Sequence, residues 1–164
     1  MVRGVPSLPG LVVGGDPTAE TAKAQPASKS LLLMARFMLD ADTVSYAIRG
    51  EGQVATHLLQ HRPSELCLSS MTLAELRFGA EAKRSRKLHR SIGSFIKDVA
   101  VIPFDEGAAD RFALVAAALA RRGAPIGTFD TLIAAHALSL GLVVVTNNTK
   151  HFSRVPGLKL ENWV

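Results

Sequence analysis

The stretch FMLDADTVSY, residues 37–46, runs three apolar residues directly into two closely spaced aspartates. A short apolar run that ends at a polar break is typical of a buried strand. Burying a carboxylate costs free energy unless the charge is paired or bound to a cation. Asp40 and Asp42 therefore indicate a site at the end of this strand, and other parts of the chain must supply the partners.

The rest of the chain alternates between strand and helix patterns. We expect strands at 36–39, 66–69, 99–104, 142–146 and 158–163. We expect helices at 43–49, 52–61, 72–82, 85–98, 105–122 and 128–140. Strands that alternate with helices form a mostly parallel sheet with helices on both faces, so the predicted fold class is α/β.

Composition limits the classes of protein that this chain can represent. The chain has 164 residues, 48% of them hydrophobic, which suits one folded domain. It has no run of 18 apolar residues, so we expect no membrane span. The net charge of +5 fits an acidic partner such as nucleic acid, or simple solubility. The single cysteine, Cys67, lies in an apolar run and is expected in the core, as suits a cytoplasmic protein.

Residues 1–33 differ from the remainder of the chain. They are rich in Pro, Gly, Ala, Ser and Thr and lack hydrophobic periodicity, so we expect a disordered extension. Prolines and glycines interrupt any apolar region, which argues against a secretory signal. The predicted domain is 34–164, and Met34 is an alternative start of translation.

Three acidic residues are expected at the same edge of the sheet. Asp40 follows the first strand, Glu75 lies one turn into the helix after the second, and Asp130 begins the helix before the fourth. Ligands of open parallel sheets bind beyond the carboxyl ends of the strands. Clustered carboxylates repel one another, so a shared cavity requires a cation, and oxygen ligands suit Mg²⁺ or Mn²⁺.

Each acid also has a purely structural explanation. Asp40 and Asp42 could cap the helix that follows them, and Glu75 could lie on a solvated helix face. Asp130 could interact with the helix dipole. The joint placement of the acids and their apolar sequence neighbours favour the site.

The other reactive residues give weaker signals. His136 shares a face with apolar residues and is expected in the core, whereas the remaining histidines, His57, His61, His89 and His151, show no metal-binding spacing. Ser69 and Ser70 lack an obvious base, which argues against a serine hydrolase.

The segment MLDADTV also matches the opening of haloacid dehalogenase-type phosphatases. That chemistry needs a later lysine and a pair of acids. Only 18 residues follow Thr146, and Glu161 is the one acid among them, so we reject this reading.

Three segments together resemble the VapC toxins of type II toxin–antitoxin systems, which are PIN-domain ribonucleases. The segments are FMLDADTVSYAIRG (37–50), LSSMTLAELRFGAE (68–81) and GAPIGTFDTLIAAHALSLGLVVVTNNTKHFSRVPGLKLENW (123–163). The resemblance covers about 34–164. It implies a PIN-like three-layer fold, with a five-stranded, mostly parallel sheet flanked by helices.

The resemblance further implies that Asp40, Glu75 and Asp130 are the catalytic residues and hold Mg²⁺ or Mn²⁺. Two departures from the family pattern concern this site. Asp42 replaces an amide in the usual LDTN opening. Many PIN domains carry a fourth acid after the fourth strand, where this chain has Thr146, Asn147 and Asn148, and we match Asn148 to that acid. Asp42 and the polar residues that follow the fourth strand, Thr146, Asn147 and Asn148, are expected to support the site. A one-metal site and a second ion held largely by substrate are both compatible with this pattern.

The implied reaction is hydrolysis of an RNA phosphodiester, with tRNA as one candidate substrate, leaving 3′-hydroxyl and 5′-phosphate ends. Basic residues near 83–90 could bind the RNA, or could simply form a solvated helix face; they are Arg77, Lys83, Arg84, Arg86 and Lys87. The resemblance also implies a VapB-like antitoxin and a homodimer. The alternative is a catalytically silent PIN-fold subunit that binds RNA or antitoxin, with Ala41 and Asn148 marking lost chemistry. Retention of the three acids favours the enzyme.

The composition of residues 1–33 gives the first testable prediction. A chain that begins at Met34 should melt within a few degrees of the full chain and keep its nuclease activity, because the removed segment buries too little apolar surface to offset its ordering entropy. Leu31, Leu32 and Leu33 could instead cover a sheet edge, in which case the melting temperature would fall sharply on truncation.

Overall fold

Five short parallel strands form a single sheet in a computed structural model that describes residues 34–164. The strands are β1 (Phe37–Leu39), β2 (Leu66–Ser69), β3 (Ala100–Ile102), β4 (Val143–Val145) and β5 (Lys159–Glu161). Their order across the sheet is β3-β2-β1-β4-β5, and every neighbouring pair is parallel. The predicted α/β fold with a five-stranded sheet is confirmed. The extension predicted at 1–33 lies outside the described residues.

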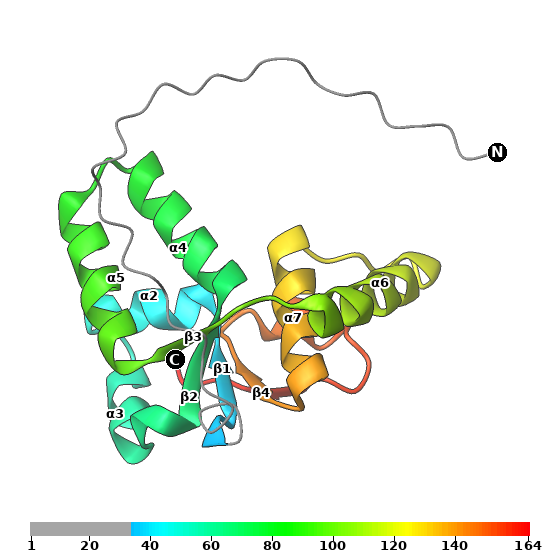
Figure 1. Cartoon of the computed structure of the whole chain (residues 1–164), viewed down its shortest axis with the longest axis horizontal. Helices are drawn as coiled ribbons and strands as arrows, with labels where there is room; N and C mark the ends of the chain where they lie inside the picture. The colour runs from blue at the N-terminus through cyan, green and yellow to red at the C-terminus, as the bar shows by residue number, and fades with distance from the viewer. Residues whose placement is uncertain (1–33) are drawn as a thin grey trace.

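Helices cover both faces of the sheet (Figure 1). They are α2 (Ala41–Arg49), α3 (Val54–Gln60), α4 (Ser70–Ala82), α5 (Arg86–Asp98), α6 (Glu106–Arg121), α7 (Thr128–Leu140) and α8 (Thr149–Phe152). Each predicted helix is present; α7 has the predicted bounds, and the others differ by one or two residues at one or both ends. The four-residue helix α8 and a 3₁₀ turn at Pro63–Glu65 were not predicted, because elements this short carry no periodic hydrophobic pattern.

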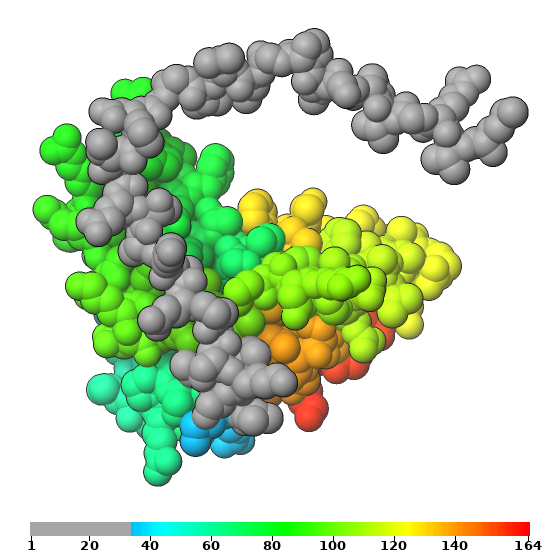
Figure 2. All heavy atoms as spheres, viewed as in Figure 1, coloured from blue at the N-terminus to red at the C-terminus, as the bar shows by residue number. Residues whose placement is uncertain are grey.

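The alternation of side chains along the strands creates two hydrophobic cores. Met38, Cys67 and Val144 face α6, α7 and α8, whereas Phe37, Leu39 and their neighbours face α2 to α5. Cys67 is fully buried, as predicted. Figure 1 shows α4 and α5 on one side of the sheet and α6 and α7 on the other, and Figure 2 shows α6 projecting from the body of the molecule.

The strand order determines where a site can form on the sheet. The chain adds β2 and then β3 on one side of β1, and afterwards crosses to β4 and β5 on the other side. Connections that leave β1 and β4 therefore diverge, and such a switch point opens a crevice beyond the carboxyl ends of the strands. Asp40 follows β1 and Thr146 follows β4, so both residues line this switch point.

In the part of the chain that the structure describes, no helix combines the length and the apolar character needed to cross a membrane.

Candidate active site

Asp40 is both a helix cap and a buried acid at the switch point. Its carboxylate accepts a hydrogen bond from the Ala41 amide at 2.8 Å, and its extended backbone makes it the N-cap of α2. Its second oxygen accepts a hydrogen bond from the Thr146 hydroxyl at 2.9 Å. With 4% of its surface exposed, Asp40 is a buried cap whose carboxylate also lies at the switch point, and its metal-binding role stays a prediction.

Asp42 does not cap α2, contrary to one expectation, because the helix begins before it at Ala41. One oxygen of Asp42 accepts from the Thr43 amide in the first turn. The other accepts from the Asn147 amide at 3.0 Å, which joins α2 to the segment after β4. Asp42 therefore faces the same crevice as Asp40.

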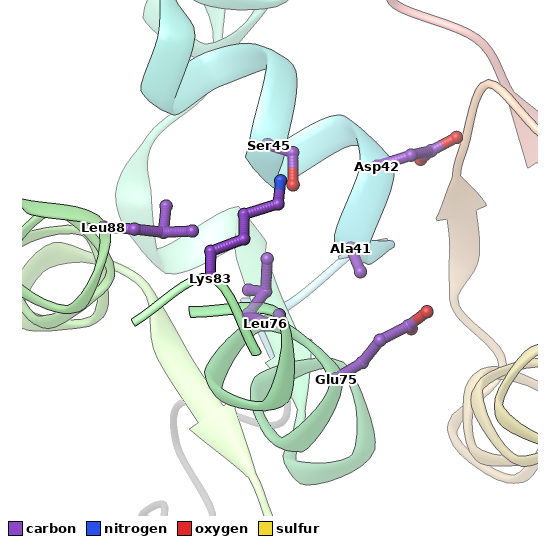
Figure 3. Close-up of a pocket in the computed structure, with 8 residues that line it drawn as sticks. Ala41, Asp42, Ser45, Glu75, Leu76, Lys83 and Leu88 are labelled. Carbon is purple, nitrogen blue, oxygen red and sulfur yellow. The ribbon is translucent and has the colours of Figure 1, made fainter. Parts of the chain in front are cut away.

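Glu75 projects from α4 into a groove of about 280 Å³ between α2 and α4. Asp42, Ser45 and Lys83 also line this groove. Figure 3 shows the carboxylates of Asp42 and Glu75 directed toward the same side, whereas the Lys83 side chain extends toward Ser45 at the other end. The groove thus has an acidic end and a basic end.

Asp130 lies in the first turn of α7, with 18% of its side chain exposed. One of its oxygens lies 3.1 Å from the Asn148 amide nitrogen and 3.1 Å from His151 Nδ1. His151 was not predicted at the site, because its spacing from the other histidines is not that of a metal-binding motif. The sequence did offer one signal that His151 lies near Asp130. His151 follows Asn148 by three residues at the start of α8, and residues i and i+3 of a helix share a face.

Three successive residues after β4 contact three different acids. The Thr146 hydroxyl donates to Asp40, the Asn147 amide donates to Asp42, and the Asn148 side chain contacts Asp130. The Thr146 hydroxyl also accepts from the Asn148 amide at 3.0 Å, which fixes the turn itself. All three residues, together with Asp42, were expected to support the site.

The acids influence one another's protonation. Burial raises the pKa of Asp40 to about 7, and the charges of Asp42 and Glu75 add to that increase. Burial also raises the pKa of Asp42 despite its backbone hydrogen bonds. The pKa of Glu75 is raised by burial, and then by the charges of Asp130 and Asp42. Like charges therefore act on Asp40 and Glu75 at this edge of the sheet, in addition to burial.

The available ligands suit a hard divalent cation, because they are carboxylate oxygens. A cation would also offset the burial and the like charges that raise the pKa of Asp40 and Glu75. Among residues 34–164, no three His, Cys, Asp or Glu side chains come close enough to hold one ion between them. Mg²⁺ commonly binds one or two carboxylates and keeps several waters, so this set fits such an ion. Direct convergence of Asp40, Glu75 and Asp130 on one cation stays a prediction.

Ser69 was expected to lack a neighbouring base, and this prediction was wrong. Its hydroxyl lies 2.9 Å from His136 Nδ1, because β2 and α7 pack together although 67 residues separate the two side chains in sequence. Ser69 and His136 are 0% and 1% exposed, and Ser69 also accepts from the Met71 amide as the N-cap of α4. No substrate reaches this pair, so it is structural, and His136 is the core histidine that was predicted.

Comparisons with known proteins agree with this fold. The PIN domain family model matches residues 37–158. A tRNA(fMet)-specific endonuclease VapC from Salmonella typhimurium is 39% identical over 131 residues, covering 79% of this chain and 99% of that protein. Ribonuclease VapC2 from Haemophilus influenzae is 36% identical, covering 80% and 100%.

Solved structures give the same result. DNA-bound VapBC from Salmonella typhimurium aligns with a TM-score of 0.73 at 40% identity, covering 80% of this chain and all of that one. VapBC2 from Rickettsia felis, bound to a promoter DNA fragment, aligns with a TM-score of 0.71 at 30% identity, covering 78% and 98%.

The match of the PIN domain model to residues 37–158 assigns this α/β sheet to the PIN domains, a class whose nucleases are typically metal-dependent. The chain belongs to the PIN-domain family and, within it, to the VapC toxin ribonucleases. The predicted family, fold and enzyme class are confirmed.

The raised pKa of Asp40 predicts how stability depends on pH when metal is removed. The folded state holds a proton on Asp40 up to about pH 7, whereas the ordinary pKa is 3.8. Stability from this proton is complete below the ordinary pKa and is lost as pH rises through the folded-state value. In EDTA, the melting temperature should therefore fall between pH 5 and pH 8, corresponding to a loss on the order of a few kcal/mol.

Asp40→Asn should make this slope clearly smaller, because an amide does not ionise and only the raised pKa values of Asp42 and Glu75 then contribute to it. Thermal melts across that pH range would show it. Asp110→Asn, on the exposed face of α6, is the matched control and should keep the wild-type slope. The same slope in wild type and Asp40→Asn would contradict the raised pKa of Asp40, whereas the opposite contribution of the buried His136 is common to both proteins.

Proposed function

We propose that this chain is the toxin of a toxin–antitoxin pair and cuts a tRNA with Asp40, Glu75 and Asp130 as its catalytic acids. The observation that carries the proposal is the segment after β4, which contacts Asp40, Asp42 and Asp130 at the switch point of the sheet. Relatives from Salmonella typhimurium and Shigella flexneri, at 39% and 38% identity, are tRNA(fMet)-specific endonucleases. Their similarity supports initiator tRNA as the first substrate to test.

Asp40, Glu75 and Asp130 are the residues that would hold Mg²⁺ or Mn²⁺. Such an ion, when bound, supplies an acidified water and polarises a phosphoryl oxygen. Thr146 orients the Asp40 carboxylate through a hydrogen bond at 2.9 Å. Asn147 and Asn148 orient Asp42 and Asp130 in the same way, so the acids keep their positions when an anionic substrate arrives.

The basic residues give RNA a route to the acidic crevice. Arg77, Lys83, Arg84, Arg86 and Lys87 are all exposed, on α4, on α5 or between them. Lys83 is the member of this group that lines the groove with Glu75. Because α4 rises about 1.5 Å per residue, the Cα atoms of Glu75 and Lys83 lie about 12 Å apart along the helix. Lys83 is thus placed at the other end of the groove, where it would bind the RNA backbone away from the phosphate that is cut.

Exposed apolar side chains support protein partners. Leu59 on α3, Phe78 on α4 and Leu114 on α6 are 89%, 71% and 63% exposed. The Salmonella typhimurium and Rickettsia felis structures are VapBC assemblies bound to DNA. We infer that this chain pairs with a VapB-like antitoxin and forms a homodimer, both of which would cover apolar surface of this kind.

Replacing single acids tests the catalytic assignment. Asp40→Asn and Asp130→Asn should each lower cleavage of initiator tRNA at least about 100-fold, and Glu75→Gln should do nearly as much, because each change removes a charge without changing side-chain shape. Cleavage is measured by gel with Mg²⁺ and with EDTA, and circular dichroism reports folding. Asp110→Asn is the control and should cut at the wild-type rate.

Wild-type cleavage by folded Asp40→Asn would refute the mechanism. If the wild-type chain binds tRNA but cuts no RNA with either Mg²⁺ or Mn²⁺, the catalytically silent alternative is correct.

A pair of lysine variants tests the RNA route. Lys83→Ala should weaken binding of tRNA to a cleavage-deficient Asp40→Asn chain and reduce the salt dependence of log Kd by about one phosphate contact. Lys87→Ala is matched in charge, but Lys87 lines a different surface hollow with Arg49 and Glu51, so it should have a smaller effect. Equal effects of both variants, measured by fluorescence anisotropy, would show that the basic residues act only through net charge.

A further inference from the structure

Three polar side-chain atoms form a nearly equilateral triangle. They belong to Asp130 of α7, to Asn148 at the N-cap of α8 and to His151 of α8. The Asn148 amide nitrogen lies 3.1 Å from Asp130 Oδ2, His151 Nδ1 lies 3.1 Å from the same oxygen, and the two nitrogens are 3.0 Å apart. Each atom therefore touches the other two at hydrogen-bond distance. Hydrogen bonds of this length explain the triangle, but so does a second arrangement.

The second arrangement is one face of a metal coordination shell. Two ligands that bind an ion at about 2.1 Å and at right angles to each other lie about 3.0 Å apart. The three sides of the triangle match that length. An octahedral ion above the triangle would take one ligand from each residue and leave its opposite face for water or substrate.

The orientation of the Asn148 amide is compatible with this role. Amide oxygen and nitrogen positions follow from the hydrogen-bond pattern, and a half-turn exchanges them. Such a turn would place the Asn148 oxygen in the triangle and give one carboxylate oxygen, one amide oxygen and one imidazole nitrogen. The charge and the donor types then suit a divalent cation.

The Asn148 side chain does not cap the helix that follows it. Asn148 is the N-cap residue of α8, where an asparagine side chain normally accepts a backbone hydrogen bond, yet its side chain makes no capping bond. The backbone amide of Asn148 instead donates to Thr146, and the side chain points at Asp130. The Asn148 side chain thus lies in the triangle, and α8 lacks a side-chain cap at its N-terminus.

The triangle is accessible on one side. The Asp130 side chain is 18% exposed and that of His151 is 43% exposed, so an ion could enter and keep water ligands. His151 Nδ1 faces Asp130, and the short helix α8 is anchored by Phe152, which is fully buried. The imidazole is thereby held on the same side as Asn148.

We propose that Asp130, Asn148 and His151 form a metal site with an imidazole ligand, which prefers Mn²⁺ to Mg²⁺. Imidazole nitrogen suits transition metals, whereas Mg²⁺ takes oxygen ligands. The site deepens the proposed function, because Asp130 belongs to both, and it would occupy the position where the fourth acid is replaced by Asn148. An imidazole ligand would make Mn²⁺ the better ion at this position.

Pulsed electron paramagnetic resonance of bound Mn²⁺ tests the site directly. Wild-type protein loaded with Mn²⁺ should show coupling of the ion to a directly bound ¹⁴N nucleus, and protein labelled with ¹⁵N only at histidine should show that signal replaced by a ¹⁵N coupling. His151→Gln should abolish the coupling and weaken Mn²⁺ binding about 10- to 100-fold in a titration. His89→Gln, a half-exposed histidine on α5 that pairs with Glu81, is the matched control and should change neither.

A bound Mn²⁺ without nitrogen coupling in wild-type protein, or coupling that persists in His151→Gln, would overturn the proposal. The labelling arm needs no variant, so a folding defect cannot produce the negative result. RNA cleavage separates this inference from the proposed function. Cleavage without nitrogen coupling refutes only the metal site, whereas nitrogen coupling without any cleavage supports the metal site and refutes the nuclease assignment.

Discussion

Repulsion among carboxylates at one edge of the sheet is the constraint on which the site depends. Burial and then like charges raise the pKa of Asp40 and Glu75, and burial raises the pKa of Asp42. Asp40 is almost completely buried. The segment after β4 offsets part of this electrostatic cost, because Thr146, Asn147 and Asn148 each contact a different acid. What remains uncompensated is a negative crevice suited to a cation and, through it, to a phosphate.

The parallel topology makes this compensation possible. β1 and β4 are neighbours, so the Asp40 amide donates to the Val145 carbonyl at 3.0 Å and the Thr43 hydroxyl donates to the same carbonyl. These bonds fix the ends of both strands relative to each other. Asp40, which follows β1, therefore lies within hydrogen-bond distance of Thr146, which follows β4. Helices α4 and α7 carry Glu75 and Asp130 at the same edge.

The site also shows how one residue can satisfy two demands. Asp40 caps α2 and faces the crevice, so the structural and functional explanations of its position were not alternatives. Asn148 shows the opposite outcome, since its side chain leaves the cap of α8 unmade and contacts Asp130 instead.

The sequence by itself determined the strands and the long helices, because hydrophobic periodicity and strand ends are local properties that a linear pattern records. It also singled out the three acids as candidates. It also identified Thr146, Asn147 and Asn148 through their position after a buried strand. Only the tertiary structure decided that Asp42 holds Asn147, that Ser69 meets His136 inside the core, and that His151 joins Asp130. These pairs lie 21 to 105 residues apart in the chain, and their geometry depends on how helices pack across the sheet, which no local pattern encodes.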